Sequence, residues 1–183
     1  MSISVREALA PAYKPTLYFM IAVVGFFVGW WINATYYSDK APVQPINFSH
    51  RIHVSENGIE CLHCHVTADR SKSASVPSVN KCVGCHKAIA KDRPEILKVF
   101  EYWEKQEPIP WIKVHDVPDF VHFTHKRHVK AGLACQECHG PVETMDRVTR
   151  VVDLKMPWCV DCHTEKQVEN GRDCWTCHAG IGQ

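Results

Sequence analysis

Cys135-Gln-Glu-Cys-His139 is one of five copies of a single pattern, and together these copies use every cysteine of the chain. Cys-x-x-Cys-His is the attachment pattern of c-type haem, in which both thiols bind the porphyrin and the adjacent imidazole ligates the iron. The sequence therefore predicts five covalently bound c-type haems. Their thioether residues would be Cys61, Cys64, Cys82, Cys85, Cys135, Cys138, Cys159, Cys162, Cys174 and Cys177. Their proximal iron ligands would be His65, His86, His139, His163 and His178.

Two other uses of paired cysteines fit the pattern poorly. Structural zinc sites combine Cys-x-x-Cys pairs in twos to complete a tetrahedron, so an odd number of pairs leaves one over. Cysteines three apart are poorly placed to form a disulfide with each other, and a disulfide framework does not explain the His after each pair.

The chain beyond its N-terminal segment has only short apolar runs, so its side chains alone would build a thin core. Covalently held porphyrins would supply the missing apolar surface and cross-link the chain. We therefore expect a mostly irregular fold with short α-helices, a class III-like multihaem cytochrome c domain that does not fold without haem. The formal net charge is +1 and no long basic run occurs, so nothing indicates binding to nucleic acid.

An uncharged stretch runs from Pro15 to Ser38, and it is apolar almost throughout between Thr16 and Ile32. It is long enough to span a bilayer, and aromatic residues at both ends resemble interfacial belts. A cleaved signal peptide would have a shorter apolar region and a small-residue cleavage site. The sequence thus predicts one N-terminal transmembrane helix, an uncleaved signal anchor over residues 15–38.

Two arguments orient this anchor. Arg6 and Lys14 precede it, which favours a cytoplasmic segment over residues 1–14, although Lys40 weakens the bias. Haem attachment to Cys-x-x-Cys-His takes place outside the bacterial cytoplasmic membrane. Residues 39–183 are therefore expected to form a pentahaem domain on its periplasmic face.

The haem domain contains a repeat. Asn47-Phe-Ser-His-Arg-Ile-His-Val54 and the first two attachment motifs match His122-Phe-Thr-His-Lys-Arg-His-Val129 and the third and fourth motifs. This self-similarity indicates a duplicated unit. We expect two modules, over residues 46–90 and 121–165, with a fifth haem site at 174–178.

The shared Phe-x-His-x-x-His element supplies imidazoles outside the attachment motifs. His50 with His53, and His125 with His128, lie three residues apart on what would be one helical turn, so neighbouring imidazoles could reach two different irons. These four are candidate distal ligands. Neutral imidazole is a good ligand when its other nitrogen is hydrogen-bonded.

A fifth distal ligand must come from elsewhere. His115 follows an extended Pro-rich stretch and is the favoured candidate, Met156 just before the fourth motif is the second, and Met145 is the third. A thioether ligand would raise the potential of its haem. His63, between two attachment cysteines, is interpreted as a surface residue.

Between the modules, Asp92-Arg-Pro-Glu95 resembles a capping box. Apolar residues follow at helical spacing, so a helix is expected to run to about Gln106.

The order of these motifs resembles a known family over nearly the whole chain. An anchor precedes Phe-Ser-His-Arg-Ile-His, and then come Pro-Trp-Ile-Lys-Val-His-x-x-Pro-Asp, Cys-Gln-Glu-Cys-His-Gly-Pro-Val-Glu and Met-Pro-Trp-Cys-Val-Asp-Cys-His. This series is similar to the pentahaem cytochrome c component of bacterial alternative complex III. That family is expected to have His where Phe120 stands and an aromatic residue where His122 stands, so a ligand role for His122 stays open.

The resemblance implies a component of a membrane complex that oxidises menaquinol. It would receive electrons from an iron–sulfur subunit, then pass them to a monohaem cytochrome subunit or a soluble periplasmic acceptor. Polytopic quinol-binding membrane subunits would be further partners. If every iron has two axial ligands, the chain is an electron carrier and not an enzyme by itself.

Two other functions compete with this expectation. A self-sufficient anchored quinol dehydrogenase that feeds a periplasmic reductase would need a quinol pocket near Trp30–Tyr37. A catalytic multihaem reductase would need a high-spin haem with a free coordination position.

Overall fold

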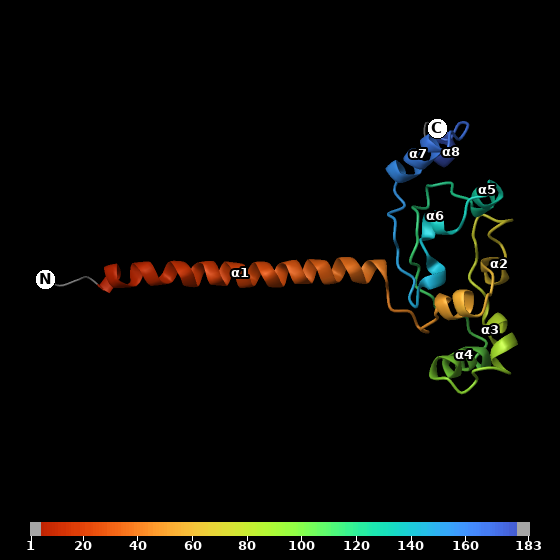
Figure 1. The fold of residues 1–183 in the computed structure, drawn as a ribbon, viewed down its shortest axis with the longest axis horizontal. Helices are drawn as coiled ribbons and strands as arrows, with labels where there is room; N and C mark the ends of the chain where they lie inside the picture. Colours follow the sequence, from red (N-terminus) through yellow and green to blue (C-terminus); the bar gives the residue numbers. More distant parts are fainter. Residues whose placement is uncertain (1–4, 179–183) are drawn as a thin grey trace. The chain divides into compact units, whose positions relative to one another are not determined.

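The computed structural model describes residues 5–178 of the chain and divides it into two compact units, Met1–Asp39 and Lys40–Gln183. Figure 1 shows a long helix followed by short helices joined by loops. The helices are α1 (Val5–Lys40), η1 (Arg51–Glu56, π-helical), α2 (Cys61–Cys64), α3 (Val79–His86), α4 (Pro94–Glu104), α5 (His125–Lys130), α6 (Gln136–His139), η2 (Val142–Thr144, 3₁₀), α7 (Met156–Glu165) and α8 (Cys174–Cys177). Residues 5–178 contain no strand, only an isolated antiparallel bridge between Val121 and His178. The expectation of an irregular chain with short helices is confirmed.

The helix α1 makes up most of the first unit. Its segment Lys14–Thr35 has a mean hydropathy of 1.8, and every side chain of that segment is exposed. Its 22 residues would extend about 33 Å as a helix, close to the thickness of a bilayer hydrocarbon core. By length and composition this helix can cross a membrane, which suggests that it anchors the chain.

The second unit has a small apolar core at one end. Val79 and Val83 of α3 pack with Val99 of α4, and Ile46 and Ile109 complete the cluster. No described side chain is less than 2% exposed, and no hydrophobic side chain between residues 110 and 178 is buried. The half of the unit that follows Ile109 therefore has no apolar core made of protein alone.

The helix α4 forms as expected, but the predicted capping box is wrong. Its N-cap is Arg93, which makes no side-chain cap, and Pro94 occupies the first turn. The carboxylate of Glu95 instead accepts hydrogen bonds from the Asn47 backbone N–H and from Lys98 Nζ, both at 2.7 Å. Glu95 thus ties α4 to the chain just before η1.

Asp146 connects two segments far apart in the sequence. It accepts a hydrogen bond of 2.6 Å from Ser49 Oγ and one of 3.2 Å from Arg51 Nε. The backbone N–H of Arg51 also donates to the carbonyl oxygen of Met145 at 3.1 Å. These bonds fix the start of η1 against the loop after η2.

Removing this carboxylate should weaken the second unit slightly. Hydrogen bonds from Ser49 and Arg51 lower the pKa of Asp146 from its ordinary 3.8. A lowered folded-state pKa stabilises the fold above pH 3.8, and that stabilisation is lost as the pH falls through the folded-state value. Because the ion pair between Arg51 and Asp146 is exposed, Asp146→Asn should change the unfolding equilibrium constant by no more than about fivefold. Thermal unfolding at pH 7 and pH 3 checks this, with the exposed Asp92→Asn as control; a variant effect that grows at low pH would contradict it.

Candidate haem sites

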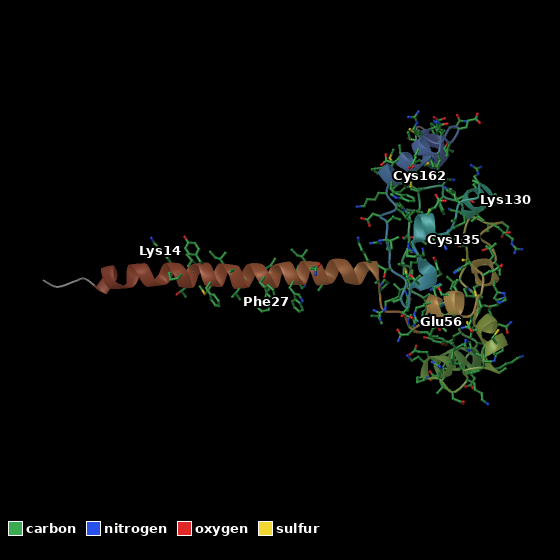
Figure 2. All side chains as sticks on the ribbon, in the orientation of Figure 1. Lys14, Phe27, Glu56, Lys130, Cys135 and Cys162 are labelled. Atoms are coloured by element: carbon green, nitrogen blue, oxygen red, sulfur yellow. The ribbon has the colours of Figure 1, made fainter. Side chains whose placement is uncertain are left out.

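Each pair of attachment cysteines lies on a single helical turn. Cys61 and Cys64 bound α2, the second motif ends α3, the third lies on α6 and its N-cap, the fourth lies in α7 and the fifth in α8. Side chains three apart on a helix face the same way, so both thiols of a pair can reach one porphyrin edge. All ten cysteines are free thiols, and each is at least partly exposed. Figure 2 shows Cys135 on the turn of α6 and Cys162 on α7.

Thiols of different attachment motifs lie next to one another. At the α3 end of the unit, these neighbours belong to the first three motifs. Burial raises the pKa of the Cys82 thiol, and the neighbouring Cys64 thiol raises it further. Burial likewise raises the pKa of the Cys135 thiol, and the adjacent Cys61 thiol, which is hydrogen-bonded to it, adds to that rise. The first motif therefore lies between the second and the third.

The same relation continues toward the other end. Burial raises the pKa of Cys138, and the nearby Cys162 thiol contributes to the shift. Burial also raises the pKa of Cys159, with a contribution from Cys177 of the fifth motif. The attachment sites thus follow the spatial order second, first, third, fourth, fifth, from α3 at one end of the unit to α8 at the other (Figure 1).

The chain has twelve histidines, and exposure divides them into two groups. His63 and His122 are exposed. The other ten are half-buried: His50, His53, His65, His86, His115, His125, His128, His139, His163 and His178. Every histidine that the sequence marks as a candidate iron ligand is half-buried, except His122.

Backbone carbonyls hold the Nδ1 atoms of three proximal candidates. His65 Nδ1 donates to the Ser75 carbonyl at 2.7 Å, and His163 Nδ1 donates to that of Gly171 at 2.7 Å. His86 Nδ1 makes a longer bond of 3.2 Å to Ile89. A proton on Nδ1 leaves the Nε2 lone pair free, which is the tautomer that binds a metal through Nε2.

Three distal candidates show the same arrangement. His53 Nδ1 donates to the Ser49 carbonyl at 2.8 Å, and His128 Nδ1 donates to the equivalent Thr124 carbonyl at 2.9 Å. His125 Nδ1 donates to the carbonyl of Lys72 at 3.0 Å. The second histidine of the Phe-x-His-x-x-His element is therefore held alike in both repeats.

Three proximal candidates face a distal candidate at a characteristic separation. The ring centroids lie 6.1 Å apart for His53 and His86, 6.1 Å for His128 and His163, and 6.3 Å for His125 and His139. Two imidazoles that bind one metal ion from opposite sides, each with a metal–nitrogen distance of about 2 Å, have centres roughly 6 Å apart. These pairs have the spacing that one iron between them requires.

His50 lies close to His65. Burial lowers the pKa of His50 to about 4, and the neighbouring His65 and His53 lower it further in that order. Burial also lowers the pKa of His139 to about 4, with contributions from His115, His125 and His65. Both imidazoles are neutral at pH 7, which is the form that ligates iron.

The candidates for the fifth distal ligand are scattered. The ring of His115 lies 4.3 Å from that of His139 at 83°, and its Nε2 is buried with no hydrogen-bond partner in the part of the chain that the structure describes. Met145 lies beside Arg51, whose backbone N–H binds its carbonyl. Met156 begins α7, with its side chain 64% exposed. The aromatic ring that faces His178 belongs to Phe120, with centroids 5.7 Å apart.

These residues fit c-type haem. The thiols come in pairs on one helical face, the imidazole after each pair is half-buried, and six imidazoles have Nδ1 bound to a carbonyl with Nε2 left for a metal. Within residues 5–178 no three His, Cys, Asp or Glu side chains come together as they would around a zinc ion. The thin apolar core also agrees with a domain that uses porphyrins as part of its core.

Two features of the site have no signal in the motifs. The carbonyls that fix His65, His125 and His163 belong to loop residues whose types are irrelevant to the bond. The position of Phe120 depends on the bridge between Val121 and His178, which joins segments far apart in the sequence. The sequence signals for the second feature are an aromatic residue just before the second repeat and its difference from the His expected at that position.

Residues 121–179, which include the last three attachment motifs, match the family model of cytochrome c7 and related cytochrome c. The chain is also 29% identical to a protein of Nitratidesulfovibrio vulgaris named menaquinone reductase, multiheme cytochrome c subunit. That alignment covers 88% of each chain. The chain thus carries a multihaem cytochrome c domain, and its similarity indicates electron transport in a quinone or quinol oxidoreductase.

Proposed function

We propose that this chain is a membrane-anchored pentahaem cytochrome that carries electrons within a menaquinol:acceptor oxidoreductase complex of the alternative complex III kind. The observation that carries the proposal is the unbroken row of attachment motifs, in which the thiols of each motif neighbour those of the next. Bound c-type haem supplies one-electron redox chemistry. Neighbouring attachment sites place such groups within reach of one another along the whole unit.

The protein would tune and orient these groups through its histidines. We assign His86, His139, His163, His65 and His178 as proximal ligands. The distal partners of the first four are His53, His125, His128 and His50, in that order, a pairing supported by the centroid separations and by the closeness of His50 to His65. In the six rings that make them, the Nδ1 hydrogen bonds would fix the ring and increase the basicity of its Nε2.

The anchor and orientation extend the proposal to the membrane. The segment Lys14–Thr35 would cross the bacterial cytoplasmic membrane, with the N-terminus inside and the haem domain on the periplasmic face. The partners would be an iron–sulfur subunit, polytopic quinol-binding subunits and a monohaem cytochrome subunit, with a soluble periplasmic acceptor. The relative from N. vulgaris, named a menaquinone reductase subunit, supports a second candidate in which the same row carries electrons toward menaquinone.

The distal assignment predicts the effect of single substitutions. His128→Ala should leave every haem covalently attached but convert one of them, the haem of His163, from low spin to high spin, because its iron loses a strong-field ligand. Electron paramagnetic resonance of the oxidised, detergent-solubilised chain measures this change. His53→Ala should do the same at His86, and the exposed His63→Ala is the matched control. Unchanged spin states in both test variants would defeat the pairing.

Copurification tests the proposed assembly. The tagged chain, solubilised from its native membrane in mild detergent, should bring down a large iron–sulfur protein and polytopic membrane proteins. The isolated complex should reduce the haems on addition of a menaquinol analogue, whereas the chain alone should not. Haem reduction by the chain alone would favour the self-sufficient quinol dehydrogenase. A complex that oxidises added cytochrome while reducing menaquinone would favour the second candidate.

A further inference from the structure

The fifth attachment site differs from three of the others in the ring that faces its proximal histidine. His86, His139 and His163 each face an imidazole at about 6 Å, whereas His178 faces the phenyl ring of Phe120 at 5.7 Å and 28°. A phenyl ring has no lone pair to donate to a metal. From this position Phe120 cannot supply an axial ligand.

The backbone fixes Phe120 at this position. Val121 pairs with His178 in an antiparallel bridge, and the backbone N–H of His122 donates to the Cys177 carbonyl at 2.6 Å. Phe120 is therefore carried on a segment that is hydrogen-bonded to the fifth motif itself. Its side chain is 64% exposed, so the ring has room to shift beside a porphyrin.

Among the described residues, no other candidate ligand makes a ring contact with His178. His115 is in ring contact with His139, and Met145 is bonded through its backbone to Arg51. Met156 and His122 are exposed, and within residues 5–178 neither side chain makes a ring contact or hydrogen bond with His178, although the His122 backbone is bonded to Cys177.

We propose that the haem iron bound by His178 has no protein ligand on its distal side, where Phe120 stands, and that it keeps an open position for a small exogenous ligand such as carbon monoxide, nitric oxide or cyanide. This inference rests on the proposed function, because it requires a haem on Cys174 and Cys177. The site stands at the α8 end of the row, next to the fourth attachment motif through Cys159. A ligand bound there would act on the last carrier of the row.

Carbon monoxide is the probe that tests the open position. The full-length, haem-loaded chain, reduced with dithionite in detergent, should bind about one equivalent of carbon monoxide, because iron with two strong protein ligands does not bind it readily. The oxidised chain should show one high-spin ferric signal among low-spin ones. Phe120→His should remove both the carbon monoxide binding and the high-spin signal by providing the missing imidazole. Phe120→Leu, the matched control, should retain both.

A haem count distinguishes a fifth haem without an open position from a chain that is not the proposed pentahaem carrier. A wild-type chain with five haems, all low-spin and none binding carbon monoxide, overturns the open site but leaves the electron carrier intact. In that case a high-spin signal created by Met156→Leu or His122→Ala would identify the ligand that replaces our assignment. A chain without haem on Cys174 and Cys177 overturns both. The carbon monoxide titration of the wild-type chain tests the open position even if the Phe120→His variant does not accumulate.

Discussion

Electron passage along the unit should cease when Cys135 and Cys138 are both replaced by alanine. The third motif lies between the first and the fourth, since Cys135 neighbours Cys61 and Cys138 neighbours Cys162. Removing its two thioether bonds releases one haem from the middle of the row, so the groups on either side lose their connection. The variant should carry one haem fewer than the parent chain, and stopped-flow reduction should reach only part of its remaining haems.

A terminal motif provides the matched comparison. Cys82→Ala with Cys85→Ala also removes one haem, but from the end of the row, so reduction of the other haems should continue. His63→Ala, an exposed change between two attachment cysteines, should have no effect. If the central and terminal double variants reduced their remaining haems equally fast and completely, the attachment sites would not form one row.

A chain made without haem should not fold its second unit. Between residues 110 and 178 no hydrophobic side chain is buried, and the buried cluster elsewhere contains only five residues. So little buried apolar surface cannot offset the conformational entropy that some 140 ordered residues lose, at about 1.5 kcal/mol per residue. Porphyrins must supply the rest of the core.

Circular dichroism during urea titration measures this. The chain expressed without a haem-attachment system, in detergent, should show helix from its apolar segment but no cooperative unfolding transition. The haem-loaded chain under the same conditions should unfold cooperatively. A cooperative transition of similar midpoint in both preparations would show that protein side chains suffice as a core.

Much of the site was predictable from the sequence because its chemistry depends on fixed local spacing. His125 and His128 lie three positions apart in the sequence, as do Cys135 and Cys138, and one helical turn converts that spacing into a shared direction. The agreement of the two repeats follows for the same reason. Both carry the same Phe-x-His-x-x-His element. The ring centroids of His53 and His86 lie 6.1 Å apart in one repeat, and those of His128 and His163 lie 6.1 Å apart in the other.

Features that depend on contacts between distant segments could not be predicted. The capping box failed because the Glu95 carboxylate is engaged by Asn47, which lies 48 residues earlier. The spatial order of the attachment sites differs from the order of the motifs along the sequence. The second motif lies at the end of the row, and the first lies between the second and the third. Phe120 likewise faces His178 because Val121 forms a backbone bridge with His178, and no local sequence pattern predicts that bridge.

The mass of the purified chain under denaturing conditions decides whether all five motifs hold haem covalently. Five covalent haems are expected, so the intact chain should exceed its 20.9 kDa polypeptide mass by that of five haem groups, and peptic digestion should place one on each Cys-x-x-Cys-His peptide. A chain with the mass of its bare polypeptide, or one with thiols at any of the five motifs still free to react, would contradict the account.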